Sequence, residues 1–270
     1  MARAPGRGRN PPVLKRYGQH FLNDKRILTA IVDALDPRPS DTVVEIGPGR
    51  GSLTEILAQR SGRLIAIEID RALAEQLKKK FAGNPTVEIV QDDVLEADIH
   101  SFAGNDFLLI GNVPYYITTP ILFNAMEPPI PRRSVFLVQR EVAERMAALP
   151  GSESYGALTV NIAAVASVEI SLAVDAQSFE PPPKVDSSVV VLTPKRLPLV
   201  DVDSLESFRR FVQASFSLRR KQMQRVLRTV RGLSPSDTAH ILAQSGIDPS
   251  SRPEVLSPEE FAHLFIQLSS

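Results

Sequence analysis

Two hydrophobic periods alternate along the chain from about residue 24. Short apolar runs rich in Val and Ile are typical of buried parallel strands, whereas apolar residues recurring every three or four positions are typical of amphipathic helices. The short runs predict strands at 42–46, 63–70, 86–91, 107–112 and 134–139. The longer period predicts helices at 24–35, 52–60, 71–81, 119–126 and 140–149. This order predicts a doubly wound, mostly parallel sheet.

The pattern changes after Gly151. Residues 157–170 and 187–194 are β-prone with no strong helix between them, and we expect them to form a closing pair of strands at the sheet edge. Beyond this pair the spacing is helical again, and it predicts helices at 205–216, 220–230, 236–245 and 257–268. One apolar stripe there indicates core packing; it consists of Met223, Val226, Leu227 and Val230.

These changes of pattern predict three parts. Residues 1–16 are rich in Pro, Gly and Arg and are expected to form a flexible basic arm. Residues 17–202 carry the strand–helix alternation and form the predicted catalytic α/β domain. Residues 203–270 form the predicted all-helical domain.

Composition removes several classes of protein. The 270-residue chain contains no cysteine, which excludes disulfides, thiolate metal sites and cysteine nucleophiles. No apolar run approaches the roughly 20 residues that span a bilayer. The first ten residues lack the apolar core of a secretory signal, and an Arg-rich transit peptide is the alternative, although they contain no serine. We expect a cytoplasmic protein without membrane contact.

The charge is balanced in total but unevenly placed. The formal net charge is +0, yet Ser207–Ser234 contains no acid and eight Lys or Arg residues. A solvated helix face would also explain such a run, but a cluster of this size favours contact with a polyanion such as RNA. The candidate RNA-binding residues are Arg219, Arg220, Lys221, Arg225 and Arg228.

Three glycines follow the first predicted strand, in Glu45-Ile-Gly47-Pro-Gly49-Arg-Gly51. Glycine at such a turn permits positive φ and lets a ligand approach the backbone. A dinucleotide fingerprint would need glycine where Ser52 stands, so a nicotinamide-type site fits poorly. The spacing resembles instead the first motif of S-adenosylmethionine-dependent methyltransferases. A tight turn without a ligand is the alternative.

Two acids follow the next two predicted strands. Glu68 ends the second strand, where a carboxylate can accept from both ribose hydroxyls. Asp93 follows the third strand, where it can accept from the exocyclic amine of an adenine. Each acid alone could be a helix cap or a solvated loop residue. Because strand ends of an open α/β sheet meet at the ligand-binding edge, the combination indicates a nucleoside-containing donor.

The tetrad Asn112-Val113-Pro114-Tyr115 follows the fourth strand, at the same edge. An exocyclic adenine amine is a poor nucleophile because its lone pair is delocalised into the ring. The Asn112 side-chain oxygen and the carbonyl of Val113 or Pro114 would accept its two N–H groups and make the lone pair available. Tyr115 would stack on the base. A simple turn is the alternative; beside a donor site, the tetrad predicts amine methylation of adenine, cytosine or glutamine.

Further motifs resemble one family. They are Tyr17-Gly-Gln-His20-Phe-Leu22, Gln139-Arg-Glu-Val-Ala, Phe179-Glu-Pro-Pro-Pro183-Lys-Val-Asp186-Ser and Phe216-Ser-Leu-Arg219-Arg220-Lys221. With the glycine turn and the tetrad, they resemble the small-subunit ribosomal RNA adenine N6,N6-dimethyltransferases of the KsgA type, from about residue 14 to the C-terminus. The resemblance implies a Rossmann-like class I methyltransferase sheet of seven mostly parallel strands with a small C-terminal helical domain.

The resemblance also implies residue roles. The implied donor-binding residues are His20, Leu22, Glu45, Gly47, Gly49, Glu68, Asp93, Val94 and Asn112, and the implied catalytic residues are Asn112, Pro114, Tyr115 and Phe179. Phe179 is expected to stack on the target base opposite Tyr115. Two positions depart from the family pattern: Val113 replaces a leucine, and Asp92-Asp93-Val replaces Gly-Asp-Ala, which is expected to tighten the adenine pocket.

The implied function is dimethylation of two adjacent adenines near the 3′ end of small-subunit ribosomal RNA, late in subunit assembly. S-adenosylmethionine is the implied methyl donor, and the partners are that RNA and the immature small subunit. We expect no metal, because the sequence shows no metal-ligating constellation, and a monomer, because it shows no coiled-coil seam.

Several alternatives share parts of this pattern. A large-subunit adenine methyltransferase of the macrolide-resistance type would share the sheet and the tetrad, but Gly18-Gln-His20 and the Phe216–Lys221 stretch favour the small subunit. A DNA adenine methyltransferase would need a large recognition domain. A ribosome-assembly factor would depend on RNA binding more than on catalysis. A donor-binding transcription factor would not need an intact tetrad.

Overall fold

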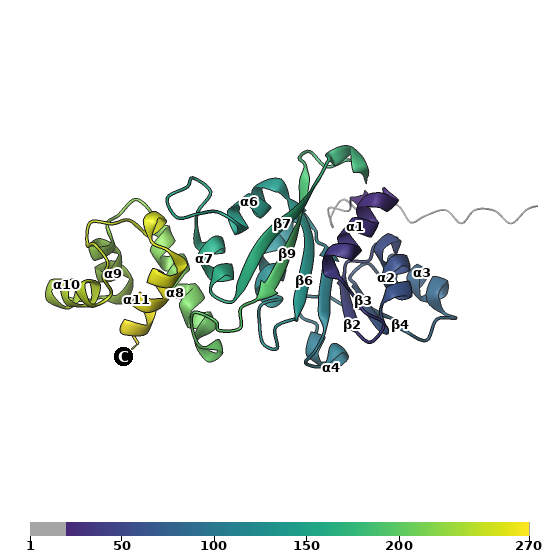
Figure 1. The fold of residues 1–270 in the computed structure, drawn as a ribbon, viewed down its shortest axis with the longest axis horizontal. Coiled ribbons are helices and arrows are strands. Elements are labelled where there is room, and N and C mark those ends of the chain that lie inside the picture. The colour runs from purple at the N-terminus through teal and green to yellow at the C-terminus, as the bar shows by residue number, and fades with distance from the viewer. Residues whose placement is uncertain (1–19, 270) are drawn as a thin grey trace, which may run out of the picture.

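The computed structural model describes residues 20–269, so the predicted arm at 1–16 lies outside the described part. Its centre is a seven-stranded sheet in the order β4-β3-β2-β5-β6-β9-β7 (Figure 1). The strands are β2 (Thr42–Ile46), β3 (Arg63–Glu68), β4 (Val87–Gln91), β5 (Leu108–Asn112), β6 (Arg133–Gln139), β7 (Ala166–Val174) and β9 (Ser187–Pro194). The first five pair in parallel, whereas β9 is antiparallel to β6 and to β7. The predicted Rossmann-like fold class is confirmed.

Helices cover both faces of this sheet. Side chains of α1 (Lys25–Leu35) and α2 (Ser52–Arg60) pack on one apolar face, and those of α4 (Ile99–Ala103), α5 (Thr118–Asn124), α6 (Arg140–Met146) and α7 (Ala157–Ala163) pack on the other. The helix α3 (Arg71–Phe81) connects β3 to β4. Central strand residues such as Val43, Val44 and Ile65 are fully buried, which explains the continuous apolar runs in the sequence. No helix within residues 20–269 is long and apolar enough to cross a membrane.

One predicted strand was partly wrong. Residues 157–163 form helix α7, and strand β7 begins only at Ala166. Leu158, Val160 and Ile162 are buried, but so are the intervening Thr159 and Asn161. A helix buried on all sides lacks an amphipathic period, so its sequence cannot be distinguished from that of a buried strand. The prediction also missed α4, which is only five residues long.

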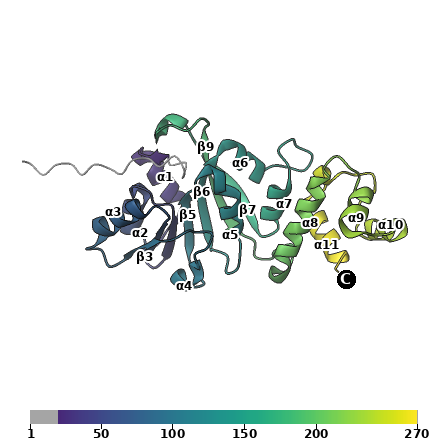
Figure 2. The ribbon, with the colours of Figure 1, turned by 180° about the vertical axis from the view of Figure 1, so that it is seen from behind.

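The C-terminal region is helical, as predicted. It comprises α8 (Leu205–Ser217), α9 (Met223–Arg231), α10 (Pro235–Gln244) and α11 (Pro258–Gln267), which lie together at one end of the molecule beside α7 (Figure 2). Met223, Val226 and Leu227 are fully buried, which confirms the core role of that stripe. One apolar cluster continues from the sheet through α7 into these helices.

A short antiparallel ribbon lies outside the main sheet. It pairs β1 (Phe21–Leu22) with β8 (Phe179–Glu180), so that Phe21 lies opposite Glu180 and Leu22 opposite Phe179. These residues come from the first and the third of the motifs that resemble the family. The ribbon therefore brings together segments about 160 residues apart.

Candidate active site

A pocket opens where β2, β3 and β5 end, as expected for an open α/β sheet. All of the predicted donor-binding residues line it, together with Pro114 and Tyr115. The β1 residues Phe21 and Leu22 and the preceding His20 also contribute to its wall. The structure therefore brings the glycine turn, the two strand-end acids and the tetrad around one cavity.

The glycine turn has the backbone that its sequence predicts. Gly49 has φ +58, and a Cβ there would lie 3.0 Å from the Phe21 ring. Gly51 has φ +82, and a Cβ there would lie 2.7 Å from Leu77. Larger residues would be strained at both positions and would collide with neighbouring side chains. The Gly49 N–H donates to Glu68 Oε2 at 2.9 Å, which fixes the turn against the end of β3.

Glu68 is a buried carboxylate held by backbone donors. Its Oε2 accepts from Gly49 and its Oε1 accepts from the Asp70 N–H at 2.9 Å. Burial raises the pKa of Glu68, and the two backbone N–H groups act against this by stabilising the charged form. Each oxygen keeps a further lone pair, so the geometry leaves Glu68 able to accept from a diol.

Glu45 is the most deeply buried acid of the pocket. It is 1% exposed, and its Oε2 has no hydrogen-bond partner among the described residues. Burial raises the pKa of Glu45 to about 8, and the nearby charge of Glu68 acts in the same direction. A buried carboxyl oxygen without a hydrogen-bond partner among the described residues is costly and is well suited to a cationic ligand group.

We expect the stability of the protein to depend on pH through Glu45. Its pKa is about 8 in the folded protein against an ordinary 4.5, so the folded state holds the proton more tightly. Its contribution is fully present below about pH 4.5 and is lost as pH rises toward and through about 8. Between about pH 6 and pH 8, the free energy of unfolding of the wild type should fall by about 2 kcal/mol more than that of Glu45→Gln, as measured by urea unfolding. Parallel pH profiles of the two proteins would contradict this expectation.

Asp93 lies in the turn after β4. Its Oδ1 accepts from the Leu95 N–H at 2.9 Å, and its own N–H donates to Asp92 Oδ1 at 2.8 Å. Both acids and Val94 line the pocket. The aspartate that departs from the family pattern therefore orders the turn that presents Asp93.

The hydrogen bonds within the tetrad indicate which of its oxygens can accept from a ligand. The Asn112 Nδ2 donates to the His20 carbonyl at 3.2 Å, and no described residue donates to its Oδ1. The Pro114 carbonyl already accepts from the Ile117 N–H at 3.1 Å and from Thr118 Oγ1 at 3.2 Å. Since a carbonyl has two lone pairs, Val113 is the better placed of the two carbonyls that the sequence left open.

Tyr115 is held from two sides. Its hydroxyl bonds to Ser187 Oγ at 2.7 Å, and its ring stacks on His20 with centroids 5.8 Å apart and planes 23° apart. Ser187 is fully buried at the start of β9. Sequence reasoning missed Ser187; its position directly after the proline-rich motif was the only signal.

The β1–β8 ribbon forms a cover for the glycine turn. The Arg50 guanidinium lies 4.2 Å from the Phe21 ring centroid and 3.6 Å from Glu180. Asn23 Nδ2 donates to Glu180 Oε2 at 3.2 Å. The sequence did not indicate these roles, because the contacts join residues far apart in the chain.

Comparison with known proteins decides the family. A family model described as ribosomal RNA adenine dimethylase matches residues 13–270. The chain belongs to the ribosomal RNA adenine dimethylase family. As in other methyltransferases, S-adenosylmethionine is the methyl donor that membership implies.

Individual members of the dimethylase family are similar over nearly the whole chain. Ribosomal RNA small subunit methyltransferase A of Geobacter metallireducens is 41% identical over 264 residues, or 96% of each chain. The protein of that name from Bacillus cytotoxicus is 41% identical over 260 residues, covering 93% of this chain and 89% of its own.

Two solved structures are also similar. A dimethyladenosine transferase from Plasmodium falciparum has a TM-score of 0.78 at 26% identity, covering 93% of this chain and 98% of its own. The 23S rRNA methyltransferase ErmE has a TM-score of 0.71 at 30% identity, covering 93% of this chain and all of its own.

Phe179 is not part of the pocket wall in this dimethylase family member. The side chain is 4% exposed and packs in the apolar cluster with Leu22 and Val189. Its predicted stacking on a target base would therefore need the ribbon to move. That role stays a prediction.

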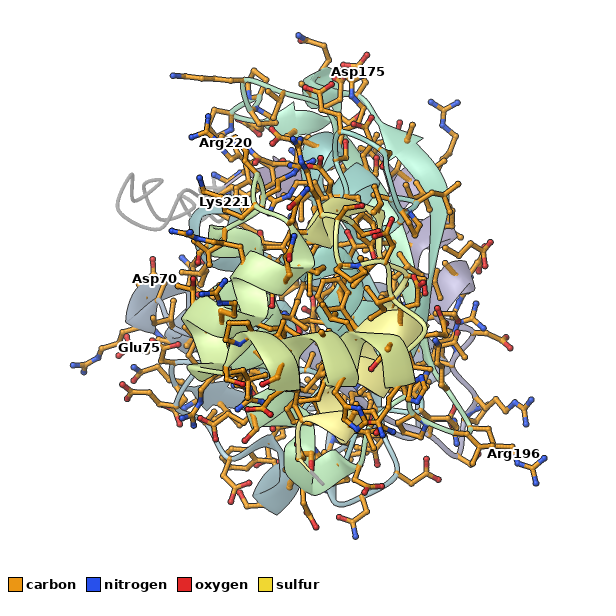
Figure 3. The ribbon with its side chains drawn as sticks, turned by 90° about the vertical axis from the view of Figure 1, so that its left-hand side faces the viewer. Asp70, Glu75, Asp175, Arg196, Arg220 and Lys221 are labelled. Atoms are coloured by element: carbon orange, nitrogen blue, oxygen red, sulfur yellow. The ribbon has the colours of Figure 1, made fainter. Side chains whose placement is uncertain are left out.

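The predicted RNA-binding residues separate into two groups. Arg220, Lys221, Arg225 and Arg228 are exposed, and no described acid pairs with them. Arg219 instead bonds to Glu254 at 2.6 Å and to the Glu153 carbonyl at 3.1 Å. Figure 3 shows Arg220 and Lys221 pointing outward from the helical end, in the same half of the view as Asp175, which precedes β8. No group of acids and histidines within residues 20–269 could hold a metal ion.

Proposed function

We propose that the protein transfers methyl groups from S-adenosylmethionine to the N6 amines of two adjacent adenines near the 3′ end of small-subunit ribosomal RNA. The observation that carries the proposal is the tetrad that lines the pocket, with Asn112 Oδ1 an acceptor to which no described residue donates. The relatives named small subunit methyltransferase A favour the small subunit as the target. The protein would act as a cytoplasmic monomer on the immature subunit.

The charges and hydrogen-bond acceptors of the pocket suit the donor. Glu45 offers a buried orphan carboxyl for the cationic amino-acid part, and Glu68 offers acceptors for the ribose hydroxyls. Asp93 lies where it would accept from the adenine amine, beside Val94. The donor supplies a methyl group on a sulfonium, which is already a good leaving group.

The tetrad would prepare the target amine. Asn112 Oδ1 and the Val113 carbonyl would accept its two N–H groups and stabilise the positive charge that develops on nitrogen during transfer. Tyr115 would stack on the base, at about 1–3 kcal/mol per base. Among the described side chains near the tetrad none is a clear general base, and the proton would leave to water after the transfer. Catalysis is then mainly positioning and electrostatics.

The exposed basic residues between α8 and α10 would hold the RNA. Unstacking a target base costs a few kcal/mol, and phosphate contacts supply binding energy against that cost. We assign this role to Arg220, Lys221, Arg225 and Arg228, and we assign Arg219 a structural role because it pairs with Glu254.

We expect Arg220→Ala/Lys221→Ala to weaken RNA binding about tenfold or more at low salt and to lower the slope of log Kd against log salt by about 1–2. Affinity for the donor should not change, since neither residue lines the pocket. Arg219→Ala is the matched control: it should lower Tm, because it leaves Glu254 unpaired, and have less effect on the salt slope. The assignment is wrong if the double variant binds RNA with the wild-type salt dependence.

The direct test uses small ribosomal subunits that lack adenine dimethylation. They are incubated with the protein and labelled S-adenosylmethionine, and the label is mapped by nuclease digestion and mass spectrometry. Two adjacent N6,N6-dimethyladenines near the 3′ end of the small-subunit RNA are the expected products. A parallel reaction contains large-subunit RNA, and label there instead would indicate an ErmE-like specificity. Binding without label would indicate an assembly factor.

A further inference from the structure

His20 makes three different contacts with parts of the site that are distant in sequence. Its carbonyl accepts from Asn112 Nδ2 at 3.2 Å. Its ring stacks on Tyr115. Its Nδ1 lies 2.7 Å from the Pro181 carbonyl. One residue of the pocket wall therefore contacts the tetrad twice and the proline-rich motif once.

These contacts determine the tautomer of His20 and the orientation of the Asn112 amide. A carbonyl only accepts, so His20 carries a proton on Nδ1 and donates it to Pro181. For the same reason the amide nitrogen of Asn112 faces His20, and its Oδ1 faces away. The position of the His20 backbone thus determines whether Asn112 presents an acceptor to the target amine.

The other ends of these contacts belong to different halves of the site. His20 directly precedes β1, which covers the glycine turn through Phe21. Pro181 begins a segment that returns to the sheet at Ser187, and Ser187 is bonded to Tyr115. The segment 181–187 is therefore attached at both ends to the stacked pair of His20 and Tyr115.

We propose that His20 is a positioning residue that couples donor binding to target binding, by linking the β1–β8 cover of the donor pocket to the orientation of Asn112 and Tyr115. This inference rests on the proposed function. A donor that orders β1 would also order the His20 backbone, and with it the acceptor on Asn112. Two ligands that order the same element bind with positive cooperativity.

The coupling is measured as a ratio of affinities. The probe is a fragment of small-subunit RNA that keeps the target adenine, with its N6 amine, and carries 2-aminopurine at the neighbouring base, whose fluorescence changes when the target unstacks. RNA is titrated into the full-length protein with and without S-adenosylhomocysteine, the demethylated donor. Wild type should bind the RNA about fivefold more tightly when the donor analogue is present.

His20→Phe keeps a ring to stack on Tyr115 but loses the donor to Pro181. It should bring the affinity ratio close to one and lower kcat about 3–10-fold, the equivalent of about one hydrogen bond. Because the analogue is added at a saturating concentration for each protein, a loss of donor affinity or of folded protein alone would not change the ratio. Arg228→Ala is the control, because it should weaken RNA binding from an exposed position outside the pocket and the ribbon, and it should keep the wild-type ratio.

The inference is overturned if wild type shows no effect of the analogue on RNA binding, if His20→Phe keeps the full ratio, or if Arg228→Ala loses it equally. Methylation is assayed separately on each protein. A wild type that shows the coupling but transfers no methyl group would overturn the proposed function and leave the role of His20 standing.

Discussion

Asn112→Ala should retain donor binding and lose about 10²–10³-fold in kcat, comparable to the removal of one preorganised hydrogen-bond partner from a transition state. The side chain hydrogen-bonds only to the His20 carbonyl among described residues, so its loss leaves the glycine turn and the strand-end acids in place. Donor affinity is measured by calorimetry and turnover by single-turnover methyl transfer. An active Asn112→Ala protein would contradict the role of this side chain.

Asn112→Asp separates two functions of the same side chain. It keeps an acceptor oxygen for the target amine but removes the donor to the His20 carbonyl. A carboxylate facing that carbonyl is unfavourable, so the substituted side chain should turn away and kcat should fall between wild type and Asn112→Ala. Full activity would mean that the contact with His20 is dispensable.

Glu68→Gln should weaken donor binding about 100-fold. The carboxylate would accept from two ribose hydroxyls, and hydrogen bonds to a charged group contribute about 1.5–3 kcal/mol each. An amide offers only one acceptor oxygen, and Gly49 and Asp70 already donate to this side chain. Calorimetric titration with S-adenosylhomocysteine measures the effect.

The control for Glu68→Gln separates recognition from loss of fold. Glu88→Gln changes an exposed acid on the neighbouring strand β4, which pairs with Arg63 away from the pocket. It should leave the donor Kd unchanged. Equal weakening in both variants would show that the effect at Glu68 does not come from contact with the ribose.

The sequence predicted the fold class and the edge of the sheet that holds the site. Strand ends determine where Glu45, Glu68 and Asn112 lie, and the apolar runs that define those strands are easy to recognise. Helix α7 was missed because burial on every side removes the periodic signal. Local patterns therefore predict elements well only where one face of the element remains polar.

The sequence predicted which residues form the site better than it predicted the contacts between them. Nothing local in the sequence shows that His20 bonds to Pro181, or that Tyr115 bonds to Ser187, because tertiary packing brings these pairs together. The run of basic residues was misleading at one position. Arg219 belongs to the basic run in sequence, but its partner Glu254 lies 35 residues further along the chain.

The apolar cluster shared by the sheet and the C-terminal helices has a consequence for how an RNA is read. It joins Val44 on β2 to Phe208 on α8 and Phe265 on α11 in one cluster of buried side chains, and such close packing opposes sliding of one part against the other. This packing therefore fixes the distance between the basic residues after α8 and Asn112. An RNA held by the basic residues would present to the tetrad only an adenine at that distance. Under the proposed function, the target would therefore be selected by its distance from the bound RNA segment as well as by its base.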